Sequence, residues 1–190
     1  ENSILSVANG ALSITGTAGS GSGVHNGVSL RGSVHSTGNS SGTISVTGTS
    51  TTNDSIYMNW STDVSSVNGN ITLVGNGKIT FYDGTIQSTG AANISITGTS
   101  NGSNASTYTG GLFLSGATIR STAVGGGSIT LVGTGATTGA GGGDHNCGIY
   151  SDWALNISSV DGAINLTGYG STNAGNNGTD NNGIHIEYGS

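Results

Sequence analysis

Apolar residues recur along the chain in pairs spaced by two, and a glycine follows two residues after each pair. Six copies of this pattern occur, among them "GNITLVGNG" at 69–77 and "GSITLVGTG" at 127–135. Alternate side chains of a β-strand point to opposite faces, so both members of a pair face the same side. This first ladder predicts inward-facing pairs at Leu12 and Ile14, Ile44 and Val46, Ile71 and Leu73, Ile94 and Ile96, Ile129 and Leu131, and Ile164 and Leu166.

Two further ladders accompany the first. The second ladder follows a loop of variable length and reads "GVSL" at 27–30, "SIYM" at 55–58, "KITF" at 78–81, "GLFL" at 111–114, "GIYS" at 148–151 and "GIHI" at 183–186. The third ladder reads "ILSV" at 4–7, "VHST" at 34–37, "VSSV" at 64–67, "IQST" at 86–89, "IRST" at 119–122 and "ISSV" at 157–160. Serine takes its third position in every copy, starting with Ser6 and Ser36, which suits either stacked hydroxyls or a bend that requires a small residue.

Together the ladders describe a repeated unit of three short strands joined by bends. One such unit cannot bury its own apolar face, whereas stacked units can. Stacking places like strands side by side in parallel, about 4.8 Å apart, and parallel crossovers are right-handed. Residues 1–190 are therefore predicted to form a single all-β domain, a right-handed parallel β-helix (β-solenoid) of about six coils. A propeller, a sandwich or a meander of hairpins fits the uneven loops less well.

Composition narrows the classes of function. The 190 residues include 37 glycines and no proline, and the formal net charge is −6 with only three Lys and Arg residues. Nucleic-acid binding needs a dense basic face, which this chain lacks. No apolar run approaches the roughly 20 residues of a membrane span, so no membrane insertion is expected. Because polar caps are not recognisable at either end of the array, the chain is expected to be a fragment of a longer repeat protein.

The recurring pattern "S-x-x-G-x-I-x-L-x-G-x-G … N-x-G-I-x-I" resembles the repeat regions of large bacterial surface exoproteins, the filamentous-haemagglutinin-like and autotransporter-like adhesins. The resemblance covers essentially the whole chain, with its most typical copy at 160–190, while the copy at 64–86 lacks the long loop. It implies a secreted or cell-surface location and use in fibres, stalks or adhesins. Uncapped strand edges predict partners that are further repeats of the same or identical chains, stacked end to end, while the long loops and Trp153 suggest a glycan or host surface as a partner.

One cluster of polar residues is a candidate ligand or metal site. Aligning Gly148 with Gly183 sets His145 beside Asp180 and Asn146 beside Asn181, in "GGGDHNCG" at 141–148 and "GTDNNG" at 178–183. Asp144 and Asp180 are weak candidates for Ca²⁺ ligands, because Ca²⁺ needs several oxygen atoms. A ladder of stacked asparagine amides is the preferred alternative. The histidines fall in different repeats, so neither a histidine metal site nor any cofactor is predicted.

Other residues suggest weaker functions. Trp60 and Trp153 follow the second ladder near bends, where each ring could stack on a sugar or fill a corner of the core. Outward Ser and Thr residues of the first ladder form hydroxyl rows, as on an ice-binding face, although Val74 and Val132 interrupt them. The acidic residues rarely share a column, which argues against a polysaccharide-degrading enzyme or any other enzyme.

The leading prediction is therefore a structural segment of an extracellular bacterial fibre or stalk. The alternative is an adhesin module that binds glycans or host proteins through the long loops at 133–147 and 168–182.

Overall fold

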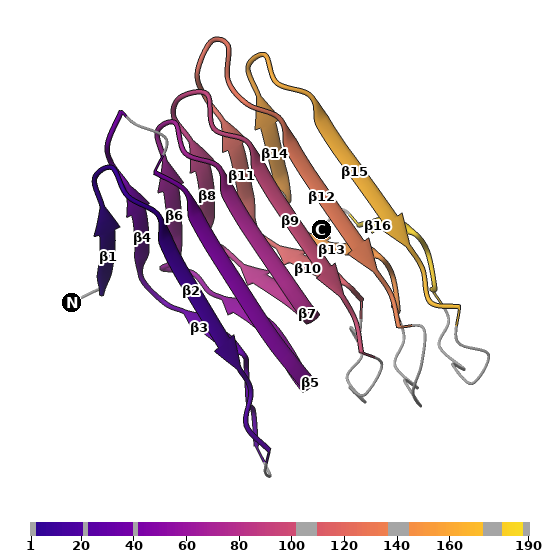
Figure 1. Ribbon diagram of the computed structural model, residues 1–190. Helices are drawn as coiled ribbons and strands as arrows, with labels where there is room; N and C mark the ends of the chain where they lie inside the picture. Colours follow the sequence, from indigo (N-terminus) through magenta and orange to yellow (C-terminus); the bar gives the residue numbers. More distant parts are fainter. Residues whose placement is uncertain are drawn as a thin grey trace.

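The computed structural model describes residues 3–20, 23–39, 42–101, 110–136, 145–172 and 180–187. Within these ranges the chain is all-β without a helix, and every strand pairing is parallel, as the ladders predict. Figure 1 shows the sequence colours running in order from one end of the stack to the other, so each strand lies beside its counterparts in neighbouring repeats. The architecture is consistent with an all-β parallel solenoid.

Strands of the third ladder form a separate six-stranded sheet. Its order is β1 (Ile4–Val7), β4 (Ser33–Ser36), β6 (Asp63–Ser66), β8 (Thr85–Ser88), β11 (Thr118–Ser121) and β14 (Asn156–Ser159).

The first and second ladders together form a ten-stranded sheet. First-ladder strands are β2 (Leu12–Thr17), β9 (Ile94–Thr99), β12 (Ile129–Thr134) and β15 (Ile164–Tyr169). Second-ladder strands are β3 (Val28–Leu30), β10 (Leu112–Ser115), β13 (Ile149–Trp153) and β16 (Ile184–Ile186). Two long strands, β5 (Ile44–Met58) and β7 (Ile71–Tyr82), belong to both ladders.

These two long strands differ from the three separate strands expected in each unit. In β7 only Asn76 and Gly77 intervene between Gly75 and Lys78, so the chain has no room for a loop between the first and second ladders. The shortest connections therefore continue the strand through the corner, whereas longer connections leave the sheet there. The corners of β5 and β7, and the described part of the connection from β2 to β3, lie along one edge of the stack (Figure 1).

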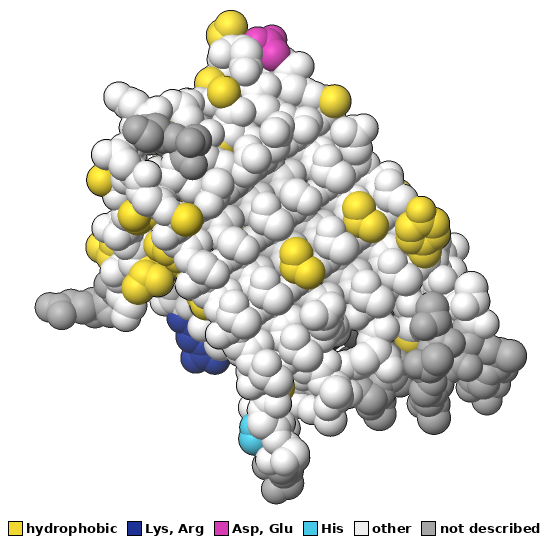
Figure 2. All heavy atoms as spheres, viewed as in Figure 1, with side chains coloured by type: hydrophobic (Ala, Val, Ile, Leu, Met, Phe, Trp, Pro, Cys, Tyr) yellow, Lys and Arg dark blue, Asp and Glu magenta, His cyan; other side chains and the backbone are white. Residues whose placement is uncertain are grey.

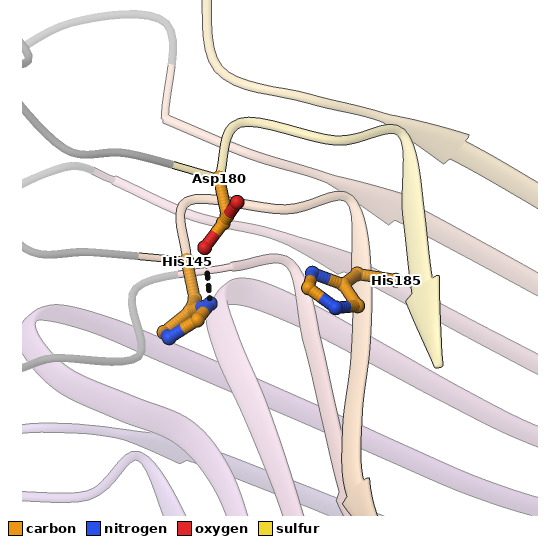
Figure 3. A group of neighbouring side chains, drawn as sticks. All are labelled: His145, Asp180 and His185. Atoms are coloured by element: carbon orange, nitrogen blue, oxygen red, sulfur yellow. Dashed lines mark ion pairs between the residues drawn. The ribbon is translucent and has the colours of Figure 1, made fainter. Parts of the chain in front are cut away.

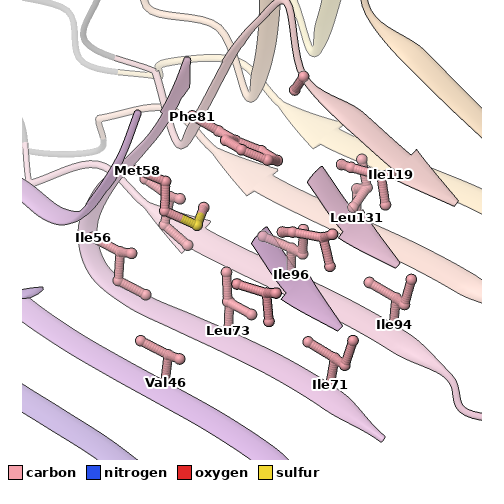
Figure 4. Packing of buried hydrophobic residues seen from close by; sticks show 14 of the residues in the cluster. Val46, Ile56, Met58, Ile71, Leu73, Phe81, Ile94, Ile96, Ile119 and Leu131 are labelled. Atoms are coloured by element: carbon pink, nitrogen blue, oxygen red, sulfur yellow. The ribbon is translucent and has the colours of Figure 1, made fainter. Parts of the chain in front are cut away.

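Inward side chains of the three ladders meet in one apolar interior (Figure 4). Ile129 pairs with Ile94 on one side and Ile164 on the other, and Leu131 pairs with Ile96 and Leu166. Middle members of these columns are fully buried, and each buried aliphatic side chain contributes about 1.5–3 kcal/mol to folding. The same column repeated in every unit therefore builds a continuous core along the stack.

The glycine after each first-ladder pair is needed where two strands approach at the corner. A Cβ atom at Gly133 would overlap the carbonyl oxygen of Gly148, which precedes the second-ladder strand β13. The same overlap occurs between Gly48 and Ser55, and between Gly168 and Gly183. Close packing of backbone against backbone, rather than an unusual φ angle, explains why this position is always glycine.

The first copy of the third ladder differs from its predicted alignment. Leu5 pairs with Val34 and Val7 with Ser36, so Val7, not Ser6, occupies the serine column. The physical reason is that this register turns two apolar side chains inward, whereas the predicted one would turn Ser6 inward and Val7 outward. From Ser36 onward the column is serine: Ser36, Ser66, Ser88, Ser121 and Ser159.

Candidate functional site

The densest group of chemically active side chains lies at the corner ahead of β13 and β16. Ile149 pairs with Ile184, so the segment that precedes β13 stacks against the segment that precedes β16. His145 Nδ1 consequently lies 3.4 Å from Asp180 Oδ2. His185, on β16, points toward both (Figure 3), and one ligand atom from each of the three residues lies within 4.8 Å of the others. We call this group the His145–Asp180–His185 cluster.

The ring of His185 is held by neighbours on both nitrogens. Its Nε2 lies 3.1 Å from Glu187 Oε1, and its Nδ1 lies 3.3 Å from the side-chain nitrogen of Asn182. An amide nitrogen only donates, so these partners assign the proton of a neutral ring to Nε2 and a lone pair to Nδ1. The imidazole is therefore oriented with an accepting nitrogen available beside the cluster.

Tyr150 forms the wall behind the two histidines. Its ring stacks on His145 with centroids 4.8 Å apart and meets His185 edge-on at 5.4 Å. Its hydroxyl donates to Glu187 Oε2 at 3.2 Å. The row of rings continues through Phe113, 5.8 Å from Tyr150, to Tyr82. Because Tyr150 is buried, it restricts the positions that both imidazoles can adopt.

Cys147 lies beside the cluster but is buried. Its thiol donates to the backbone carbonyl of Asp180 at 3.2 Å. Burial raises the pKa of the Cys147 thiol, a backbone hydrogen bond from Asn182 opposes this, and the charges of Asp180 and Glu187 raise the pKa further. The residue therefore remains a protonated thiol, which is neither a good nucleophile nor a ready metal ligand.

The remaining residues of the predicted polar cluster are spread between core and surface. Asn146 is fully buried and its backbone carbonyl accepts from Ser171 N, so its side chain is not open to a ligand from solvent. Asn181 is exposed. Asp144 lies outside the described residues. Asp180 lies beside His145, and the ligand atoms grouped with its carboxylate are the imidazole nitrogens of His145 and His185, a different donor set from the one considered for Ca²⁺.

Sequence reasoning missed His185. The signal was present in the second ladder, because the alignment of "GIYS" with "GIHI" pairs Tyr150 with His185. That register brings His185 next to the residues that precede β13. Inspection of outward positions in the ladder, as well as inward ones, would have found it.

A second candidate site surrounds Trp60. A surface pocket of about 270 Å³ is lined by Trp60, Ser61, Thr62, Asp63, Asp83, Gly84, Thr85, Gln87 and Arg120. The Trp60 side chain is 74% exposed. Arg120 donates to Gln87 Oε1 from Nε and Nη2, at 3.1 and 2.9 Å. An exposed ring, two carboxylates and a guanidinium group therefore share one polar hollow.

The second tryptophan lies at the same edge of the stack. Trp153 is the last residue of β13 and is 50% exposed. Trp153 pairs with Ser115 of β10, and Ser115 pairs with Tyr82 at the end of β7. Tyr82 lies three residues after Ile79, which pairs with Ile56 of β5. Trp60 therefore follows β5 and Trp153 ends β13, so both lie near the bend toward the third ladder.

The outward hydroxyl rows of the first ladder lie on a broad face. One row reads Thr15, Thr47, Val74, Thr97, Val132 and Thr167 in consecutive strands. Figure 2 shows this face as mostly uncharged and polar, with isolated hydrophobic side chains. The two valines break the regular array of hydroxyls that an ice-binding face would present.

No family model, curated protein or solved structure matches the chain. In the described part of the chain, no helix is long and apolar enough to cross a lipid bilayer. The stacked repeats and the two polar sites are therefore the features on which a functional proposal rests.

Proposed function

We propose that the chain is a structural segment of an extracellular bacterial fibre or stalk, of the adhesin-like type that its repeats resemble, with a mechanical rather than an enzymatic role. In this proposal it is a right-handed parallel β-helix of six coils, secreted or held at the cell surface. The handedness follows the general rule for parallel crossovers. Six coils spaced about 4.8 Å apart would make a segment roughly 29 Å long.

The observation that carries this proposal is a difference between the middle and the ends of the stack. Ile71 and Ile129 are fully buried, whereas Ile164, in the same column, is 42% exposed. At the other end Leu5 is 51% exposed, and an opening of about 300 Å³ is lined by Leu5, Ile14, Leu30 and Val34 among others. Both end surfaces thus expose residues of the apolar columns, which supports contact with a further repeat in this proposal.

Strand edges at these ends also favour stacking. Among the described residues, β14, β15 and β16 each pair on one side only, as do β1, β2 and β3 at the opposite end. Unpaired parallel edges offer hydrogen-bonding groups to a matching strand. The matching partner in this proposal is another repeat of the same kind, supplied in purified protein by a second copy of the chain.

Composition supports the same role. The chain contains only three Lys and Arg residues, so stacked coils bring few like charges together. It contains no proline, so every residue keeps a backbone donor for the ladders. A rod that works by length and stiffness requires these properties.

Electron microscopy and sedimentation of the purified chain test the proposal. We expect short rods that lengthen with concentration, and fibre diffraction with a repeat of about 4.8 Å along the rod axis. Ile184→Lys places a charge on one end surface and should abolish lengthening. Thr97→Lys places the same charge on the lateral face and should leave it intact. Compact particles of fixed size at all concentrations, without the axial repeat, would contradict the proposal.

The Trp60 pocket favours a second function, glycan binding. A planar exposed ring supplies a stacking surface for a sugar, while Asp63, Asp83 and Arg120 supply hydrogen-bonding groups for hydroxyls. This function is compatible with a fibre, because the pocket lies on the side of the stack rather than at its ends.

A glycan array tests this second function with matched tryptophan variants. We expect Trp60→Ala to remove binding and Trp153→Ala, which lies outside the pocket, to retain it. Equal binding by both variants would show that the glycan does not bind in the Trp60 pocket, and no binding by the wild-type chain would contradict the glycan-binding function.

A further inference from the structure

We propose that the His145–Asp180–His185 cluster binds a divalent transition-metal ion of the zinc class. Two imidazole nitrogens and one carboxylate oxygen form a donor set that suits Zn²⁺ and related ions such as Co²⁺. Ca²⁺ and Mg²⁺ prefer sites built from oxygen atoms alone. The mixed donor set therefore points to a borderline-soft cation, and not to the Ca²⁺ that the acidic residues suggested.

Distances within the cluster are close to those of a metal site. Tetrahedral zinc with bonds of about 2.0–2.1 Å places neighbouring ligand atoms about 3.4 Å apart. His145 Nδ1 and Asp180 Oδ2 are already 3.4 Å apart, and all three ligand atoms lie within 4.8 Å of one another. A side-chain rotation that moves a ring nitrogen of His185 from within 4.8 Å to about 3.4 Å of the other two ligand atoms, a shift of up to about 1.4 Å, would complete three positions of a tetrahedron. The fourth position would hold water.

Access and burial also suit an ion. The side chains of His145 and His185 are 19% and 22% exposed, while that of Asp180 is 44% exposed. The carboxylate therefore faces solvent, where it can meet a hydrated cation, and the imidazoles lie deeper. Asn182, which contacts His185 Nδ1, is itself exposed and is free to turn away when a metal takes that nitrogen.

Residues around the cluster hold its ligands in place. Glu187 accepts from His185 Nε2, which leaves Nδ1 for the ion and makes the ring a stronger donor, as in carboxylate–histidine–metal arrangements. Tyr150 stacks on His145 and binds Glu187 through its hydroxyl, so one side chain supports both histidines. The charges of Asp180 and Glu187 together offset the charge of a divalent ion.

A bound ion would connect the two last second-ladder repeats. His145 precedes β13, and Asp180 and His185 belong to the repeat of β16. In the described residues β16 is three residues long and pairs only with β13. The metal would therefore fasten β16, a short strand that is paired on one side among the described residues, to the repeat of β13.

Cobalt binding to the full chain, stripped of metal with a chelator, tests the inference. We expect one Co²⁺ per chain with the visible absorption of a tetrahedral site, displaced by one equivalent of Zn²⁺. His145→Gln and His185→Gln should each weaken binding at least tenfold, because each removes a ligand. Zn²⁺ should raise the unfolding temperature of the wild-type chain but not of these variants.

The chain offers a matched control. His35 also pairs with a carboxylate, since its Nε2 lies 3.2 Å from Asp63 Oδ2, but it belongs to no cluster of three ligands within the described residues. His35→Gln should therefore retain full affinity and the Co²⁺ spectrum. Circular dichroism of the metal-free variants separates lost ligands from lost folding. Equal affinity in all variants, or no tetrahedral Co²⁺ spectrum in the wild-type chain, would overturn the proposal.

Discussion

The carboxylate of Asp54 lies 3.2 Å from the ammonium nitrogen of Lys78 on the neighbouring strand, and both side chains are largely buried. Removal of one partner leaves a poorly solvated charge, so we expect Asp54→Asn to destabilise the fold by about 2 kcal/mol. Urea unfolding midpoints measure this effect.

Two further variants make this prediction specific. The double variant with Asp54→Asn and Lys78→Gln should be more stable than Asp54→Asn alone, because no unpaired charge remains. Arg120→Gln removes a positive charge from an exposed site and should change stability by less than about 0.5 kcal/mol. With Lys78→Gln measured alone as well, a double variant as unstable as the sum of the two single changes would show that the pair is not coupled.

Gly133 should not tolerate a side chain. Its Cβ would overlap the carbonyl oxygen of Gly148, so we expect Gly133→Ala to cost about 3 kcal/mol and to lower the soluble yield. Gly19 has no atom within 4 Å of the position of a Cβ, and Gly19→Ala is the matched control. Similar unfolding midpoints for the two variants would refute the close approach at the corner.

The serine column contains buried hydroxyls whose removal should cost little stability. Among the residues that the structure describes, the buried Ser66 Oγ has no hydrogen-bond partner. Replacing an unsatisfied polar group with a methyl removes a desolvation penalty, so Ser66→Ala should leave stability unchanged or raise it by up to about 1 kcal/mol. Ser66→Val, which enlarges the side chain, should destabilise. A clear loss of stability in Ser66→Ala would favour stacked hydroxyls over the requirement for a small residue.

Cys147 should react slowly with thiol reagents in the native protein. Burial raises its pKa, so the reactive thiolate is scarce and poorly accessible at pH 8. We expect iodoacetamide to modify it at least about tenfold more slowly than in the unfolded chain.

The same shift in pKa implies a loss of stability at high pH. In the unfolded chain the thiol has a pKa of about 8.5, whereas in the folded protein it keeps its proton to higher pH. The native state therefore gains stability from the protonated thiol below that pH, and loses it as the pH rises toward the folded pKa. Unfolding midpoints of the wild-type chain and Cys147→Ala, compared between pH 7 and 10, measure the difference. Identical pH dependence in both would count against a raised pKa.

The parallel architecture could be predicted because the pattern is repeated. Each glycine and apolar pair of the first ladder fixes a register, and Ile94, Ile129 and Ile164 are paired in the structure as in the alignment. The predicted register of the first copy of the third ladder was wrong because Ile4, Leu5 and Val7 are all apolar, so two registers fit the alternation. The pairing of Leu5 with Val34 in the structure, not the sequence pattern, distinguishes the two registers.

The polar sites were harder to predict because they depend on outward side chains. Phe113 and Tyr150 occupy outward positions of the second ladder, yet both are buried in a small second cluster with Cys147. A strict alternation of inward and outward residues assigns such positions to solvent. The sequence pattern therefore does not reveal that Tyr150 packs behind His145 and His185. The Trp60 pocket likewise combines bend residues, Trp60 and Asp83, with outward side chains of the third ladder such as Gln87 and Arg120.

The direction of the ladder hydrogen bonds has a mechanical consequence. Strands lie across the stack, so these bonds run along its axis and bear tension end-on. A repeat that is pulled as a whole must break the hydrogen bonds of its three ladders at the same time. A pull on one terminal strand, such as β16, breaks the hydrogen bonds one after another. The molecule therefore resists extension as a column but peels from its free ends.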